Sequence, residues 1–391
     1  MSKEIKILNP LLSLTFLMLG SAYFMSFISI RLHLNKNHLF LIGMVQSAVY
    51  LGIYFGSMVV EKIVSRIRHI QGYAFFAAFY IASILFQGVF LHPYVWIVFR
   101  FITGFSLVSL WLIVESWVLM VSPEDKRGKF IGFYFIVLNV SQAIAQFFLD
   151  IVPVQSFLPF LFTGICLAIS IVPISFSKCQ LPVGKEVQKQ NFQNFIKRAP
   201  LGLITCLLGG AISGSLFAFM PIYAKIQQFP VSLVMFSLIF GGVVFQWPVG
   251  HLSDIFSRRI ILFAVSVISI VICLSIMHIS SPIYAIILLF FLGALVFKVY
   301  PLGIGLICGN ISKYNFIAVT CKVLMLYGIG AILGNLLVSI CISIWSSNGL
   351  FMFLIGLFIL QLLFILIFFQ KERPRRKKEV HYPDTMTPYF E

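Results

Sequence analysis

Residues 349–370, GLFMFLIGLFILQLLFILIFFQ, are almost entirely apolar and contain no charged side chain. An α-helix of about 20 such residues spans the hydrocarbon core of a bilayer, which is about 30 Å thick. The apolar residues do not alternate with period two, which is the pattern of an outer-membrane barrel strand. This stretch therefore predicts a transmembrane helix.

Similar apolar runs occur along the whole chain. Of the 391 residues, 60% are hydrophobic and 10% are charged, against roughly a quarter charged in a typical soluble domain. So few polar residues could not cover a soluble core of this size, and lipid must therefore be the solvent. We expect an all-α membrane protein with twelve transmembrane helices, near residues 9–32, 39–60, 72–92, 94–121, 130–151, 157–177, 200–225, 231–250, 260–279, 283–307, 316–345 and 349–370.

The long polar segment 178–199 lies near the middle of the chain and separates six predicted spans from six others. The halves resemble each other, since Ile63-Val-Ser-Arg66 and Ile255-Phe-Ser-Arg258 occupy corresponding loops. Many transporters consist of two such halves that hold the substrate between them. We expect an N-terminal six-helix bundle at 1–177, a cytoplasmic linker at 178–199, a C-terminal six-helix bundle at 200–370 and a basic cytoplasmic tail at 371–391.

Lysine and arginine are distributed unevenly between the two sets of loops. With the N-terminus inside, the outer loops hold only Arg31, Lys36 and Lys225, and the inner loops and chain ends hold nearly all the others. The positive-inside rule then predicts that both termini are cytoplasmic. The basic tail would contact anionic lipid.

The net charge of +16 does not indicate nucleic-acid binding, because the basic residues lie in short loops and at the chain ends and no soluble domain carries them. The seven cysteines form no CxxC motif and no Cys/His cluster, so we expect no metal site and no cofactor. The partners that we expect are a small-molecule solute and the lipid bilayer, with protons as a further option. We expect no nucleic acid, and we expect a monomer.

Two short motifs carry charge. The loop segment GHLSDIFSRR, residues 250–259, places Asp254 close to Arg258 and Arg259. An acid and two arginines in so short a loop can form a charge-paired latch between neighbouring helices. In span 4, the segment RFITG buries Arg100 in lipid and places Gly104 one turn later, where it relieves crowding.

These motifs, with the predicted six-plus-six layout, resemble the major facilitator superfamily. The loop is similar to the signature G-x-L-x-D-x-x-x-R-R, with Ser257 where glycine is usual, and the span-4 segment is similar to R-F-x-x-G. The segments WLIVES (111–116), FMPIY (219–223), QWPVG (246–250) and Tyr300-Pro301 resemble the bacterial inner-membrane carriers of the YcaD type. The resemblance implies the major facilitator fold and secondary transport, and it implies no particular solute.

The chain departs from the superfamily pattern at two places. The first-half loop has Ser65 where the signature has aspartate, although Arg66 and Arg68 could still serve in a gate. Span 5 lacks the Gly-Pro pair that is typical of drug antiporters, which argues against drug export.

Charged groups inside spans cost about 2.5–3.5 kcal/mol at the bilayer centre, so each needs a reason. Arg100 is a candidate ligand for an anion or a modulator of a proton carrier, and the alternative is a structural pair with Asp150. Glu115, on the same broad helix face as Arg100 and Trp111, is a candidate proton carrier. The favoured alternative is a gate pair between Glu115 and Arg66 or Arg68.

Lys298 lies deep in span 10, directly before Tyr300-Pro301. It is a candidate anion ligand or a partner for Glu115, and the alternative is a lysine that extends to the membrane interface. Lys322 lies near the inner face, where such an extended conformation is favoured.

Span 5 carries a polar stripe with helical spacing. The stripe either lines an aqueous cavity, which we favour, or hydrogen-bonds to neighbouring helices. Its members are Asn139, Gln142, Gln146 and Asp150.

Together the charged groups inside the spans have a net charge of +1, with three cations against two acids. The sequence therefore predicts a secondary active transporter that moves a small anionic or zwitterionic solute across the bacterial inner membrane by alternating access, with proton coupling left open. There is no phosphate-binding G-x-x-x-x-G-K-[ST] loop for an ATP engine. A non-transporting receptor on the same fold is the main alternative. An intramembrane enzyme and a channel are disfavoured, and we expect no enzymatic activity.

Overall fold

The computed structural model describes residues 3–64, 69–122, 127–176, 199–279, 281–308 and 316–369. The regular elements within these ranges are all helical. They are α1 (Lys3–Leu34), α2 (Leu39–Val64), α3 (His69–Val89), α4 (Pro93–Val121), α5 (Arg127–Ala145), α6 (Phe148–Ile151), α7 (Leu158–Ser175), α9 (Pro200–Ile226), α10 (Val231–Val244), α11 (Gln246–Ile255), α12 (Arg258–Met277), α13 (Pro282–Cys308), α14 (Phe316–Trp345), the 3₁₀ turn η3 (Ser346–Asn348) and α15 (Gly349–Phe369).

The described chain contains 11 stretches that are long and apolar enough to cross a membrane. The last of them, Lys322–Phe368, is 47 residues long and contains two helices, α14 and α15, with η3 between them. Two spans, α5 with α6 and α10 with α11, are interrupted helices. The described residues thus form twelve membrane-spanning segments, which confirms the predicted fold class.

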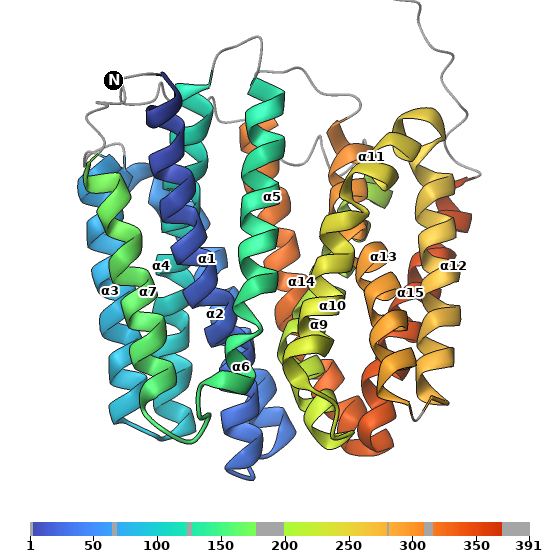
Figure 1. Ribbon diagram of the computed structural model, residues 1–391. Coiled ribbons are helices and arrows are strands. Elements are labelled where there is room, and N and C mark those ends of the chain that lie inside the picture. Colours follow the sequence, from blue (N-terminus) through green and yellow to red (C-terminus); the bar gives the residue numbers. More distant parts are fainter. Residues whose placement is uncertain are drawn as a thin grey trace, which may run out of the picture.

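The helices form two groups that stand side by side (Figure 1). Helices α1–α7 form one bundle and α9–α15 form the other, and consecutive spans run antiparallel to each other. We call the side where α1 begins and α15 ends the N-terminal face, which is at the top of Figure 1. The other side is the opposite face. The linker predicted at 178–199 and the tail at 371–391 lie essentially outside the described residues.

The two bundles use the same device to pack their second helix against their fourth. A Cβ atom on Gly104 of α4 would lie 1.9 Å from the backbone oxygen of Val49 on α2. In the second bundle, a Cβ atom on Gly293 of α13 would lie 1.7 Å from the backbone oxygen of Leu238 on α10. Small residues let membrane helices approach closely, so both glycines are required where the backbones touch.

Proline explains the break between α10 and α11. Pro248 has no N–H group to donate to the carbonyl of Val244, four residues earlier, and α10 ends at Val244. Phe245 is the residue between the two helices. The predicted span at 231–250 is therefore two helices that meet at a break, and α11 continues to Ile255.

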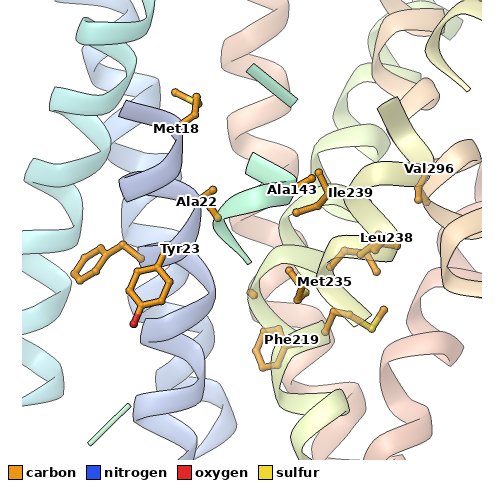
Figure 2. Close-up of a cluster of buried hydrophobic side chains, with 14 of the residues drawn as sticks. Met18, Ala22, Tyr23, Ala143, Phe219, Met235, Leu238, Ile239 and Val296 are labelled. Carbon is orange, nitrogen blue, oxygen red and sulfur yellow. The ribbon is translucent and has the colours of Figure 1, made fainter. Parts of the chain in front are cut away.

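The bundles meet along helices α2 and α14, α5 and α10, and α1 and α9. On α2, Ser47 donates a hydrogen bond of 3.1 Å to the backbone oxygen of Ile332 on α14. Between α5 and α10, Ala143 lies beside Ile239 in the apolar contact that Figure 2 shows. The rings of Phe147 and Phe236 are 4.6 Å apart farther along. These contacts extend from the middle of the helices toward the opposite face.

Candidate functional site

Arg100 is a charged side chain in the interior of the first bundle and is 1% exposed. Its Nη2 atom donates a hydrogen bond of 2.6 Å to Oε1 of Gln46 and one of 2.8 Å to the sulfur of Met25. The guanidinium carbon lies 5.5 Å from the centre of the Phe24 ring, a cation–π contact. Its Nε atom is buried and has no hydrogen-bond partner within the described chain. The described residues thus surround this cation with neutral groups.

Gln46 holds the guanidinium in one orientation. Its Nε2 atom donates 2.9 Å to the backbone oxygen of Met25 and 2.5 Å to Oγ of Ser29, both on α1. These bonds leave Oε1 free to accept from Arg100. Gln46 is completely buried, so the arrangement joins α1, α2 and α4 at a fixed position.

Asp150 is not the partner of Arg100. It lies on α6, is exposed, and accepts hydrogen bonds from the hydroxyl and the backbone N–H of Ser232 on α10. The structural pair between Arg100 and Asp150 that the sequence allowed is therefore wrong. The two residues are near the outer ends of consecutive spans, but helix rotation and the break after Ala145 give them different neighbours.

Tyrosines extend from Arg100 across the contact between the bundles. Tyr50 and Tyr80 lie within electrostatic range of the guanidinium. The Tyr50 ring is 6.4 Å from the ring of Tyr327 on α14, and Tyr327 hydrogen-bonds Ser213 on α9. The centre of the Tyr300 ring lies 4.8 Å from the centre of the Tyr327 ring. Tyr327 of the second bundle thus lies next to Tyr50, which is itself a neighbour of the buried cation.

Trp111 and Glu115 have a different environment from Arg100. Both are half-buried, and Tyr134 of α5 lies within interaction range of each. Tyr134 itself is 1% exposed. The shared helix face that we expected for Arg100, Trp111 and Glu115 thus divides into two settings, with Arg100 toward α1 and α2 and the other two toward α5. The alternative gate pair of Glu115 with Arg66 or Arg68 lies outside the described residues.

Lys298 is buried in the second bundle, with 6% exposure. Its Nζ atom donates 2.5 Å to the backbone oxygen of Gly242. Gly242 lies in the last turn of α10, just before the break at Phe245. A cation at the C-terminal end of a helix interacts favourably with the helix dipole and with unpaired carbonyls. Lys298 therefore joins α13 to a broken helix end, and its ammonium group has a local structural role.

The polar stripe of span 5 is interrupted, because α5 ends at Ala145. Gln146 is fully buried. It accepts a hydrogen bond of 2.8 Å from Ser26 and donates one of 3.4 Å to the backbone oxygen of Ala22, both on α1. Gln146 therefore bonds a neighbouring helix, which was the less favoured alternative for the stripe. Gln142 donates 3.6 Å to the sulfur of Met18. Asn139 donates 2.7 Å to a carbonyl of its own helix, and these two amides are half-buried.

Part of the predicted gate lies within the described residues. Arg258, at the start of α12, donates from Nη1 to the backbone oxygen of Gly305 on α13. Ser257, where the superfamily signature has glycine, accepts 3.4 Å from the N–H of Ile260 and caps α12. Arg259 begins the same helix.

The other gate residues are described less fully. Asp254 lies within α11, and its side chain is outside the described set. Arg66 and Arg68 also lie outside it. The latch between the acid and the arginines therefore remains a prediction.

Two buried amides that the sequence analysis did not single out belong to this region. Gln46 orients Arg100, and Asn335 of α14 lies in the contact with α2 and is completely buried. Each is an isolated amide in an apolar span, which is the sequence signal that could have identified it. Among the described residues there is no group of three or more His, Cys, Asp or Glu side chains that could hold a metal ion.

The sequence has relatives among bacterial transporters. It is 26% identical over 338 residues to an uncharacterized MFS-type transporter of Enterobacter sp. (strain 638), and the match covers 83% of this chain and 86% of the relative. It is 27% identical over 338 residues, with the same coverage, to the uncharacterized MFS-type transporter YcaD of Escherichia coli O9:H4 (strain HS).

Solved structures share the fold. A crystal structure of the nucleoside transporter NupG matches 93% of this chain and 100% of its own, with a TM-score of 0.81 at 14% identity. A bacterial homolog of the human lysosomal transporter Spinster matches 94% of this chain and 96% of its own, with a TM-score of 0.76 at 13% identity.

The predicted resemblance is confirmed by a family model. The model of the Major Facilitator Superfamily matches residues 11–315 and 231–391. With the transporter relatives, this match supports a multi-pass membrane protein that acts as a secondary transporter. The chain belongs to the Major Facilitator Superfamily.

Proposed function

We propose that this chain moves a small anionic or zwitterionic solute across a bacterial inner membrane by alternating access, with Arg100 as the residue that binds the anionic group. One observation carries the proposal: within the described chain, Arg100 is a buried guanidinium surrounded by neutral partners. A buried cation without a counter-ion is costly in a membrane, and an anionic solute would supply the missing charge.

The position of Arg100 supports this role. It lies seven residues after the start of α4, about 10 Å along the helix, and its tyrosine neighbours reach the second bundle. A solute that bridges Arg100 and Tyr327 would contact both bundles at once. Transporters of this architecture bind solutes between their repeats and rock the repeats around the site.

Lys298 contributes less to the charge of the site, because its ammonium group is bonded to Gly242. Asp150 is exposed and bonded to Ser232, so setting Lys298 and Asp150 aside together leaves the same excess of one cation that the sequence count gave. This charge balance favours an anionic group on the solute, whether the whole solute is an anion or a zwitterion.

The excess of basic residues in the loops at the N-terminal face supports a cytoplasmic location for that face. The bundles are in contact from the middle of the membrane to the opposite face. We therefore assign the structure to a state that is closed toward the outside. The rocking motion would separate α2 from α14 and α5 from α10 to admit solute from that side.

The candidate proton carrier is Glu115, with Trp111 and Tyr134 as neighbours. Glu115→Gln removes the titratable group and keeps the size of the side chain. We expect this variant to lose stimulation of uptake by an imposed pH gradient while it retains exchange of solute across the membrane. Full stimulation in the variant would exclude Glu115 as the proton carrier.

The function is tested by uptake and efflux in proteoliposomes that contain the purified chain, with and without a pH gradient. The solute panel should contain organic anions, zwitterions, organic cations and neutral solutes. We expect anions or zwitterions to accumulate in liposomes with protein and to compete with one another. Transport of organic cations alone would refute the anion assignment, and binding without transport of any member would favour a receptor.

A further inference from the structure

Helices α2 and α14 form a close contact between the bundles around Asn335. A Cβ atom on Gly43 of α2 would lie 2.7 Å from the backbone oxygen of Asn335 and 3.3 Å from the Ser339 side chain. One turn earlier on α14, the carbonyl of Ile332 accepts the hydrogen bond of Ser47. We call this contact, formed by Gly43, Ser47, Ile332, Asn335 and Ser339, the α2–α14 seam.

The carboxamide of Asn335 is unusual within the seam. Asn335 is 0% exposed, and neither Nδ2 nor Oδ1 has a hydrogen-bond partner among the described residues. Both polar atoms of this side chain are thus buried without a described partner, on a residue whose backbone oxygen lies at the contact that separates if the bundles rock. A buried polar group without a partner costs free energy that hydration would return.

We propose that Asn335 sets the balance of the transport cycle by destabilising the closed α2–α14 seam. When α2 and α14 part, water can reach the carboxamide and satisfy both atoms, so the open state gains free energy that the closed state lacks. The close packing at Gly43 and the hydrogen bond of Ser47 favour closure, and Asn335 opposes it. Opposing contributions of similar size keep both states populated, as alternating access requires. This inference rests on the proposed transport mechanism and adds a residue that touches no solute.

The seam can be tested without knowledge of the solute. Ser47→Cys places a thiol in the seam, where a membrane-impermeant maleimide reaches it only when the bundles separate. The labelling rate is measured in right-side-out and inside-out membrane vesicles, and the rate for the chain with its native cysteines alone is subtracted. Asn335→Leu in this background replaces the amide by two methyl groups of the same branching and removes both unpaired polar atoms.

We expect Asn335→Leu to lower the labelling rate of the introduced thiol in right-side-out vesicles by about tenfold, because the unpaired groups no longer oppose closure. Asn335→Ala removes the same atoms without added bulk and should lower the rate in the same direction. In proteoliposomes, both variants should lower the maximal transport rate more than they change the solute concentration for half-maximal transport.

Gln361 provides a matched control. It is also a fully buried amide whose oxygen has no partner in the described part of the chain, but it lies on α15 and donates 3.1 Å to Thr205 within the second bundle. Gln361→Leu should leave the labelling of the introduced thiol unchanged.

An unchanged or higher labelling rate in both Asn335 variants would overturn the inference. An equal fall in Gln361→Leu would also overturn it, because the effect would then be general to buried amides. A fall confined to the Asn335 variants in a protein that transports no tested solute would support the seam device and count against the proposed function. Normal transport with no change in labelling would support the proposed function and overturn the inference about the seam.

Discussion

The fourth helix of each bundle carries a buried cation, and the two cations have different surroundings. Arg100 of α4 is bonded to the side chains of Gln46 and Met25 and keeps an Nε atom that no described residue pairs. Lys298 of α13 is bonded to a backbone carbonyl at the end of a broken helix. The bundles share their packing, with Gly104 and Gly293 in matching contacts, but Arg100 is held by side chains of two other helices and Lys298 by the end of a broken helix. Similar folds therefore place one cation among side chains near the contact between the bundles and the other at a helix end.

The largest expected effect distinguishes the two cations in transport. Arg100→Gln should lower solute uptake by about a hundredfold, because a charge-assisted hydrogen bond to the solute is lost, while Lys298→Gln should lower it by less than about tenfold. Arg100→Lys retains the charge without the planar guanidinium, and its uptake rate should lie between those of the other two variants. Initial uptake rates in proteoliposomes with equal protein content measure this difference. Equal losses of uptake in Arg100→Gln and Lys298→Gln would show that the two cations do not differ in their contribution to transport.

The shared packing predicts a similar loss of stability in both halves. Gly104→Ala and Gly293→Ala each place a methyl group against backbone at 1.9 Å and 1.7 Å, so each should lower the free energy of unfolding by about 3 kcal/mol. Gly132→Ala is the control, since a Cβ atom there meets nothing within 4 Å. Unfolding in mixed detergent micelles, followed by circular dichroism, measures the loss. Tolerance of alanine at either site would show that the helices can separate without penalty.

The role of Lys298 as a helix cap predicts a moderate loss of stability. Lys298→Met keeps an apolar chain of similar length but leaves the carbonyl of Gly242 without its cationic donor. The free energy of unfolding should fall by about 2 kcal/mol, and solute affinity should change little. Thermal unfolding and a solute competition assay separate the two properties. A large loss of affinity with unchanged stability would place Lys298 in the solute site.

The smallest effect is expected at the edge of the contact between the bundles. Asp150 is exposed and accepts hydrogen bonds from Ser232, a buried residue of α10. Asparagine at this position keeps one accepting oxygen, so only part of a contribution of about 0.5–1.5 kcal/mol is lost. Asp150→Asn should therefore increase access to the seam from the opposite face by about threefold or less. Maleimide labelling in the Ser47→Cys background measures the change. A decrease in access would show that Asp150 does not help to hold the closed state.

The sequence predicted the twelve spans with small errors at their ends. The largest differences occur where a span breaks: the run at 231–250 became α10 and α11, and the run at 130–151 became α5 and α6. Hydropathy averages over many residues and does not respond to a single residue such as Phe245 between two helices. Pro248 carried the signal for one break, and no proline within the span marks the other.

The candidate site was predicted less completely. Arg100 was identified because a buried charge stands out in an apolar run, but its partner Gln46 was not, and Asp150 was wrongly offered as an alternative partner. Gln46 and Asp150 differ in which neighbouring helix they reach, and that depends on how each helix rotates about its axis. A single sequence records the spacing along each helix and does not record the rotation between helices.

By itself the sequence determined that the chain is a multi-span helical membrane protein, because backbone groups in lipid must be paired within a helix and apolar length sets each span. Its motifs also identified the superfamily. The tertiary structure alone decided that Arg100 lies among neutral groups, that Lys298 caps α10 and that Asn335 has no described partner in the seam. These features arise where helices that are distant in sequence come together, and lipid, which solvates every apolar face alike, gives the sequence little pattern that specifies which faces meet.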